Sequence, residues 1–146
     1  MQFKYLTLTS AIVTAISLVN SVNAVAVQLR NGEIVTKDKI LEWIATTEAN
    51  LTFIGEPITK RITEDTMVVY CSVRTQDVCG GACTVYNGGA TCLNAPNTNC
   101  LSATNNVGFC DRGGCGGSCN QLSTCGVRLD DGFCYTPGTS SINVGF

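Results

Sequence analysis

The sequence predicts a small, disulfide-rich and mainly β domain, built from short hairpins that about five disulfides hold together. Three observations predict this class. All ten cysteines of the 146-residue chain lie between Cys71 and Cys134, so their number is even and their density is high. Thirteen of the 15 glycines fall in residues 62–146, and the apolar runs there are short. Such stretches are typical of scaffolds in which disulfides replace a large apolar core.

Residues 1–24 have the features of a secretory signal peptide. Lys4 gives a positive start, residues 6–19 form an apolar run, and Val22-Asn23-Ala24 offers a cleavage site. The run is shorter than the roughly 20 residues that cross a bilayer, which argues against a membrane anchor. We therefore expect a secreted, extracellular protein, free or associated with a cell wall, that does not insert into membranes once the signal is removed.

The composition argues against several classes of function. The chain has a net charge of −2 and no histidine, so it lacks the commonest general base and a favoured zinc ligand. It has no basic run to bind phosphate backbones or anionic membranes, so we expect neither a nucleic acid nor a lipid partner. We also expect no cofactor. An extracellular protein or polysaccharide remains as the partner, and the oligomeric state is open.

Residues 25–61 contain no cysteine and form a distinct N-terminal segment. Asn31-Gly32 between apolar runs predicts a hairpin, and residues 51–54 predict a short strand. Asn50 begins a sequon for N-glycosylation. Thr36 can cap one short helix that runs from residue 37 to about residue 48. The largely apolar face of this helix comprises Ile40, Trp43, Ile44 and Thr47.

The dibasic pair Lys60-Arg61 separates this segment from the cysteine-rich domain of residues 62–146. One interpretation makes it a processing site of the kind that kexin-type proteases cleave, so that residues 25–61 are a pro-region. The other keeps the segment as an amphipathic lid, packed on the domain through Trp43, Ile44 and Phe53. The sequence leaves both open.

Within the cysteine-rich domain, residues 66–73 carry the strongest strand pattern and are expected to form a central strand. Two hairpins are predicted, over residues 84–92 and 127–135, because each has turn residues between apolar runs. Residues 94–106 are polar and rich in turn formers. Residues 142–146 predict either an edge strand or a frayed tail.

The cysteines divide into two groups of five, in residues 71–100 and 110–134, and each group contains one Cys-Gly-Gly-x-Cys pentapeptide. This repetition predicts an internal duplication. Because five is odd, complete pairing requires at least one disulfide between the two halves. The individual pairings stay open. The two groups are Cys71, Cys79, Cys83, Cys92 and Cys100, followed by Cys110, Cys115, Cys119, Cys125 and Cys134.

The glycines of the pentapeptides have a conformational explanation. Two bridges that leave a short loop in different directions require φ values that glycine reaches without a Cβ penalty. Four thiolates from the two pentapeptides could alternatively bind zinc. The secretory signal, the lack of histidine and the six further cysteines argue against a metal site.

Three stretches of the chain resemble the cysteine-rich small secreted proteins of mushroom-forming (basidiomycete) fungi. They are residues 79–89 (CGGACTVYNGG), 105–110 (NNVGFC) and 113–120 (GGCGGSCN). The resemblance covers roughly residues 70–146. It implies a secreted fungal protein that acts in growth, differentiation or interaction with a host or substrate, and it brings no catalytic or ligand-binding residues to this chain.

We expect a non-enzymatic, effector-like protein that acts through surface contacts. Catalysis would have to rest on carboxylates, and a small stapled domain has little volume for the cleft that a carboxylate pair needs. A protease inhibitor is one alternative, with residues 94–99 as its rigid loop. The carboxylates in question are Asp77, Asp111, Asp130 and Asp131.

A carbohydrate- or cell-wall-binding module is the other alternative. Four aromatic residues lie beside predicted turns, where exposed rings could stack on sugars. The competing interpretation places the same rings in the core, since aromatic side chains are usually buried. These residues are Tyr86, Phe109, Phe133 and Tyr135.

Overall fold

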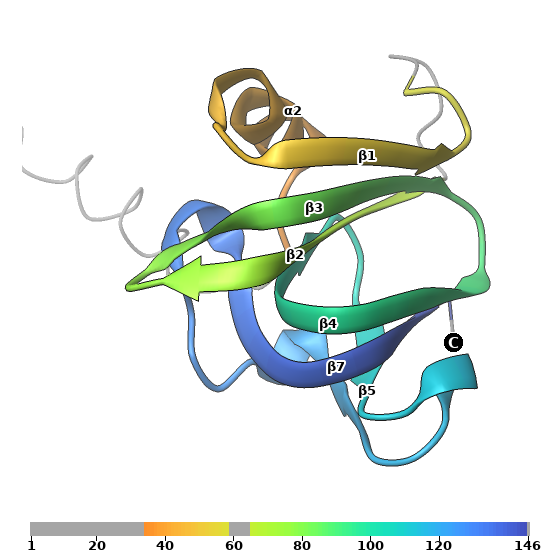
Figure 1. The fold of residues 1–146 in the computed structure, drawn as a ribbon. Helices are drawn as coiled ribbons and strands as arrows, with labels where there is room; N and C mark the ends of the chain where they lie inside the picture. Colours follow the sequence, from red (N-terminus) through yellow and green to blue (C-terminus); the bar gives the residue numbers. More distant parts are fainter. Residues whose placement is uncertain (1–33, 59–64, 146) are drawn as a thin grey trace, which may run out of the picture. The chain divides into compact units, whose positions relative to one another are not determined.

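The computed structural model describes residues 34–58 and 65–145, which belong to one compact unit (Figure 1). The predicted signal peptide, the hairpin at Asn31-Gly32 and the dibasic pair Lys60-Arg61 lie outside the described residues. The seven strands form one sheet in the order β1-β3-β2-β4-β7-β5-β6, which confirms a mainly β fold. The strands are β1 (Asn50–Gly55), β2 (Thr66–Thr75), β3 (Val78–Gly88), β4 (Thr91–Ala103), β5 (Val107–Cys110), β6 (Cys119–Gln121) and β7 (Cys134–Val144).

Strand β2 is an interior strand, as its sequence predicts. Residues 66–71 are all buried, and β3 and β4 both pair antiparallel with β2. Alternate side chains of β2 point to opposite faces of the sheet. Met67 and Val69 join an apolar cluster with Ile40 and Trp43, whereas Val68 belongs to a second cluster. The core therefore has two parts.

The predicted hairpin over residues 84–92 is wrong. Strands β3 and β4 both pair with β2, so they flank it and are not neighbours in the sheet. The tight hairpin instead joins β2 to β3 at Gln76-Asp77, where Gln76 has a φ of 55°. Because β2 is buried on both faces, it lies inside the sheet with a partner along each edge, and the chain after β3 passes β2 and supplies the second partner, β4.

Strands β4 and β7 also correct the sequence-based expectations. Residues 94–103, expected to be turns, belong to the long strand β4, with register shifts between Asn94 and Cys100. The predicted edge strand or tail at the C-terminus is part of β7, which pairs with both β4 and β5. Thr98 of β4 and Thr139 of β7 are both buried and lie opposite each other in this pairing. Residues 94–97 (NAPN) are of types depleted in strands, so their strand conformation depends on tertiary pairing more than on propensity.

The N-terminal segment packs on the sheet through helix α2 (Lys37–Thr46) and β1. The Thr36 side chain accepts a hydrogen bond from the Lys39 amide at 3.3 Å, so the predicted cap and start of the helix are confirmed. The Trp43 ring lies 5.0 Å from the Phe133 ring, between centroids. Ile44 also packs on this cluster, but Phe53 is 54% exposed and does not contribute as expected.

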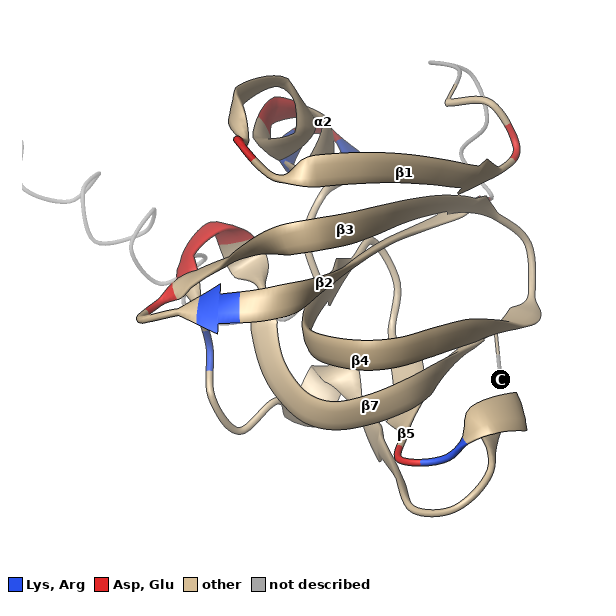
Figure 2. Ribbon diagram, in the orientation of Figure 1, with Lys and Arg blue, Asp and Glu red and all other residues tan. Residues whose placement is uncertain are grey.

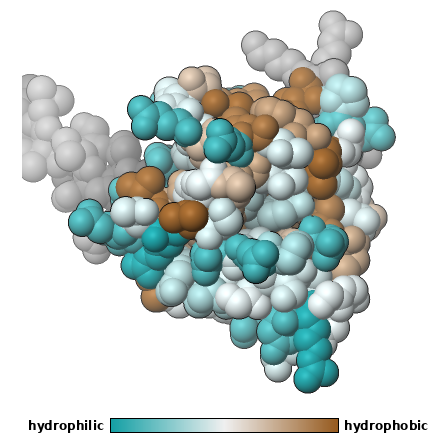
Figure 3. All heavy atoms as spheres, in the orientation of Figure 1, coloured by the Kyte–Doolittle hydropathy of each residue, from teal (hydrophilic) through white to brown (hydrophobic). Residues whose placement is uncertain are grey.

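Strand β1 pairs in parallel with β3 and forms one outer edge of the sheet. Asn87, expected in a hairpin turn, is buried and holds the end of this strand. Its Nδ2 donates to the carbonyls of Glu56 and Pro57, at 3.3 and 3.4 Å. Figure 3 shows hydrophobic residues over β1, where Phe53 and Ile54 are exposed.

Candidate functional site

All ten cysteines are paired, so the predicted framework of five disulfides is confirmed. One bridge, Cys92–Cys115, joins the two halves as parity requires. The thiols of the two pentapeptides are used in four different bridges. The five pairs are Cys71–Cys83, Cys79–Cys100, Cys92–Cys115, Cys110–Cys119 and Cys125–Cys134.

The two pentapeptides close their bridges in the same way. In each half the last cysteine of the pentapeptide bonds the first cysteine of the group, which lies directly opposite on an antiparallel strand. The Cα atoms are 4.1 Å apart in Cys71–Cys83 and 4.0 Å apart in Cys110–Cys119. The halves therefore share one construction at this point, which supports the predicted duplication.

The second glycine of each pentapeptide has the same role in both halves. Gly81 and Gly117 have φ values of 82° and 77°, in the left-handed region that favours glycine. A Cβ on Gly81 would lie 2.7 Å from Cγ2 of Val73. A Cβ on Gly117 would meet the side chains of Asp111 and Arg112. Both glycines thus let the chain pass close to the residues that follow the first cysteine.

In each half, a backbone amide of the pentapeptide donates a hydrogen bond to a side chain beside the first cysteine. The amide of Ala82 donates to Oγ of Ser72 at 3.1 Å, and the amide of Ser118 donates to Oδ1 of Asp111 at 2.9 Å. Both acceptors directly follow the first cysteine of their group. Asp111, considered above as a catalytic carboxylate, therefore has a structural hydrogen bond.

The first cysteine of each pentapeptide forms a disulfide with a cysteine of strand β4. Cys79 bonds Cys100 near the end of β4, and Cys115 bonds Cys92 near its start. Buried Ser141 reinforces the second link, because its Oγ accepts from the Cys115 amide at 2.9 Å and donates to the Arg112 carbonyl. Both copies are therefore tied to one strand between them.

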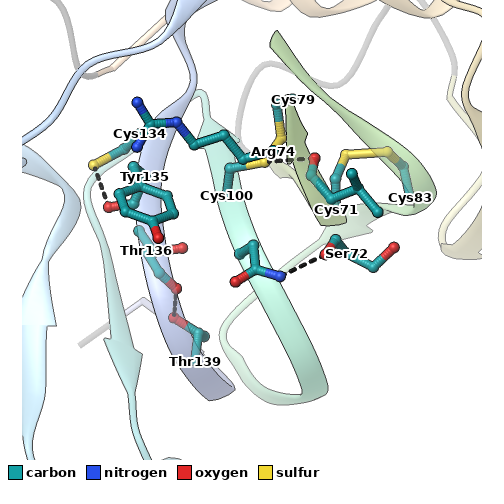
Figure 4. Close-up of a disulfide and its surroundings, with 12 residues drawn as sticks. Cys71, Ser72, Arg74, Cys79, Cys83, Cys100, Cys134, Tyr135, Thr136 and Thr139 are labelled. Atoms are coloured by element: carbon teal, nitrogen blue, oxygen red, sulfur yellow. Dashed lines mark hydrogen bonds between the residues drawn. A yellow bond between two sulfur atoms is a disulfide. The ribbon is translucent and has the colours of Figure 1, made fainter. Parts of the chain in front are cut away.

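The four rings considered above as sugar-facing do not form a common surface, and the burial of two of them agrees with the competing interpretation that places them in the core. Tyr86 and Phe133 are buried, at 8% and 3% exposure, in different clusters. Phe109 and Tyr135 are half-buried and pack against opposite clusters. Figure 4 shows Arg74 beside the Tyr135 ring, with Cζ 4.3 Å from the ring centroid. Aromatic side chains are usually buried, and rings next to turns can still reach the core.

Acidic residues are spread over several separate parts of the described chain (Figure 2), and three of the four candidate carboxylates, Asp77, Asp130 and Asp131, lie in two turns that contact each other. Asp77 in the β2–β3 turn lies 3.8 Å from Nη2 of Arg74. The Asp130 amide donates to the Asp77 carbonyl at 2.8 Å, so the β2–β3 turn contacts the predicted 127–135 hairpin. That hairpin is confirmed, with Asp131 and Gly132 at φ values of 59° and 78° in its turn. Asp130 and Asp131 are exposed turn residues.

Residues 94–99 do not form the projecting inhibitor loop that the sequence suggested, because they lie within β4. Asn50 is exposed at the start of β1, where a glycan could be accommodated. The strands themselves are nearly uncharged. Among the seven, only β2 carries a charged residue, Arg74.

A hollow of about 320 Å³ lies between the irregular part of β4 and the β2–β3 hairpin. We call it the Tyr70 hollow. Hydroxyl and amide side chains dominate its lining, and none of its lining residues is charged. Sequence-based reasoning missed it, because no contiguous motif encodes a space between strands. Its polar and aromatic lining comprises Tyr70, Ser72, Thr84, Asn94, Asn97 and Thr98.

Two tyrosines of the second cluster have hydroxyl groups whose pKa is raised above the ordinary value. Burial raises the pKa of Tyr70 above its ordinary value, and the hydrogen bond with Thr84 partly offsets this effect. Burial also raises the pKa of Tyr86, helped by the negative charges of Asp65 and Glu56. The Tyr86 hydroxyl donates to the Gly89 carbonyl at 2.6 Å. Both rings therefore act as neutral, anchored parts of the scaffold at ordinary pH.

Comparisons of the chain with protein families, with curated proteins and with solved structures find no match. In the part of the chain that the structure describes, no helix has the length and apolar character needed to span a membrane. The function must therefore be inferred from the geometry.

Proposed function

We propose that this chain is a secreted, non-enzymatic, effector-like protein that acts through surface contacts outside the cell. The observation that carries the proposal is the pairing of all ten cysteines in five disulfides. Such dense pairing persists in oxidising, extracellular compartments. The signal-like residues 1–24 and the resemblance to fungal small secreted proteins support the same location.

The engagement of two acidic side chains supports a binding role over catalysis. Asp111 accepts a structural hydrogen bond, and Asp77 pairs with Arg74 at the surface. A rigid scaffold favours binding, because little conformational freedom is lost when a partner docks. The described strands of this scaffold offer a surface on which Arg74 is the only charged side chain.

Expression of the full chain in a eukaryotic secretory host tests the location. We expect disulfide-bonded protein in the medium, with no thiol titrated in the native state. Its intact mass then reports cleavage near residue 24, processing at Lys60-Arg61 and glycosylation at Asn50. Retention of the chain inside the cell with free thiols would contradict the proposal.

Binding of the recovered protein tests the role. Fluorescently labelled protein should bind fungal cell walls or intact host cells saturably, and unlabelled protein should displace it. Reduced and alkylated protein is the control, since it keeps the sequence and loses the scaffold. Conversion of a wall polymer or peptide substrate by the purified protein would contradict the non-enzymatic role.

A further inference from the structure

We propose that the Tyr70 hollow binds the uncharged hydroxyl groups of a short carbohydrate segment. This inference rests on the proposed extracellular function and names its ligand class. The hollow measures about 320 Å³, at the lower end of the roughly 300–1,000 Å³ of small-molecule sites. A site of this size fits a short segment or chain end of a saccharide.

The walls of the hollow are held in place before any ligand arrives. Cys71 lines the hollow, and the Cys71–Cys83 bridge pins β2 to β3 beside it. The Cys79–Cys100 bridge ties β3 to β4. Asn99 also links β4 to β2, because its Nδ2 donates a hydrogen bond to the Ser72 carbonyl. Such preorganisation lowers the entropic cost of binding.

The chemistry of the lining matches a neutral polyol. Amide side chains donate and accept hydrogen bonds, as sugar hydroxyls do, and Asn94 and Asn97 expose amides at the hollow. Tyr70 also lines the hollow, but its side chain is only 8% exposed, so the exposed asparagines are the main contacts that the hollow offers to a sugar.

Other ligand classes fit the same lining less well. A phosphate or nucleic acid needs cationic partners, and a divalent cation needs carboxylate oxygens. The hollow has neither among its lining residues. An extended peptide usually adds to a free strand edge. The pairing of β2 with β4 ends at Cys71 and Cys100, so a peptide is the competing ligand, and binding of a peptide but no saccharide at the hollow would contradict the proposal. The uncharged hydroxyl and amide lining favours the hydroxyl groups of a saccharide.

Asn97 has a backbone that allows a clean test. Its φ is 58°, a left-handed conformation that glycine adopts without strain. Asn97→Gly thus removes the amide and leaves the chain path intact. Asn94→Ala removes the second exposed amide. Asn120→Ala is the matched control, because Asn120 is also an exposed strand asparagine but lines a separate hollow near Cys110–Cys119.

The experiment is a titration of the isotope-labelled secreted protein, followed by amide NMR. The probes are neutral oligosaccharides of β-1,3-linked glucose, β-1,4-linked glucose, β-1,4-linked N-acetylglucosamine and mannose. We expect at least one to shift the amides of Ser72, Ala82 and Asn97 saturably, with an affinity that salt does not change. Asn94→Ala and Asn97→Gly should each weaken binding, and their combination should weaken it by roughly tenfold or more. Asn120→Ala should bind like the original protein.

The inference is overturned if none of the saccharides shifts these amides, if the shifts map elsewhere, or if the double variant binds unchanged. Any of these results can occur while the labelled protein still binds cell walls or cells. In that case the proposed extracellular role stands and only the carbohydrate site fails. If the unmutated protein binds neither cell walls nor cells, the proposed function itself is refuted.

Discussion

Alanine at the two glycines of one pentapeptide should have opposite effects on stability. Gly81 has a φ of 82°, and an added Cβ would lie 2.7 Å from Cγ2 of Val73. A left-handed backbone costs a residue with a Cβ about 1–2 kcal/mol. Val73 is exposed, but its Cβ would lie 2.9 Å from the added atom and moves only with the backbone, which adds roughly 1–3 kcal/mol. We therefore expect Gly81→Ala to lower the free energy of unfolding by about 2–5 kcal/mol.

Gly80 is the matched control on the preceding residue. An added Cβ there meets no heavy atom within 4 Å, and its φ is outside the left-handed region. Alanine at such a site stabilises by about 0.4–1 kcal/mol, because it restricts the unfolded chain. The second pentapeptide gives an independent pair. Gly117→Ala should destabilise, while Gly116→Ala places its Cβ 3.6 Å from the Gly113 carbonyl and should be tolerated.

The assay is reversible denaturant unfolding of the four variants with their disulfides intact. Mass spectrometry of non-reduced digests confirms that each variant keeps the five native bridges, so that differences report the backbone and not mispairing. Equal stabilities of Gly80→Ala and Gly81→Ala would refute the reasoning. So would a stable Gly117→Ala, since the two copies would then not share one construction.

Three further predictions concern the core, the tyrosines and the disulfides. Trp43→Ala should lower the free energy of unfolding by about 3–5 kcal/mol, because the buried ring packs on Phe133. Phe53 is exposed, so Phe53→Ala should lower it by less than about 1 kcal/mol. Similar losses in thermal or denaturant unfolding would mean that α2 does not pack as described. Tyr70 and Tyr86 have raised pKa values in the folded state. Above the unfolded-state tyrosine pKa of about 10, the folded state therefore still holds protons that the unfolded state has lost. The free energy of unfolding should be steady below that pH and should fall as the pH rises from there through the folded-state pKa values. Tyrosinate absorbance and denaturation between neutral and alkaline pH check this, and stability that rises with alkaline pH would contradict it. On graded reduction and alkylation, Cys92–Cys115 and Cys110–Cys119, each with one exposed cysteine, should open before the buried bridges Cys71–Cys83 and Cys79–Cys100; the reverse order by mass spectrometry would contradict the burial pattern.

Local chemistry in the sequence was sufficient for several parts of this structure. Thr36 predicts the helix start because a cap depends only on the adjacent turn. Parity predicts a bridge between the halves, and Cys92–Cys115 supplies it. The pentapeptide glycines predict left-handed backbone, which Gly81 and Gly117 adopt. Each of these depends on residues close in sequence or on simple counting.

The tertiary structure alone decided the order of the strands and the surface they enclose. Turn residues after Tyr86 indicate where the chain bends, but they do not show that the next strand, β4, pairs along the other edge of β2. The same placement buries Tyr86 and Phe133 and opens a hollow beside Tyr70. Burial and cavities depend on which distant strands become neighbours, and those contacts are long-range consequences of packing that no local pattern encodes.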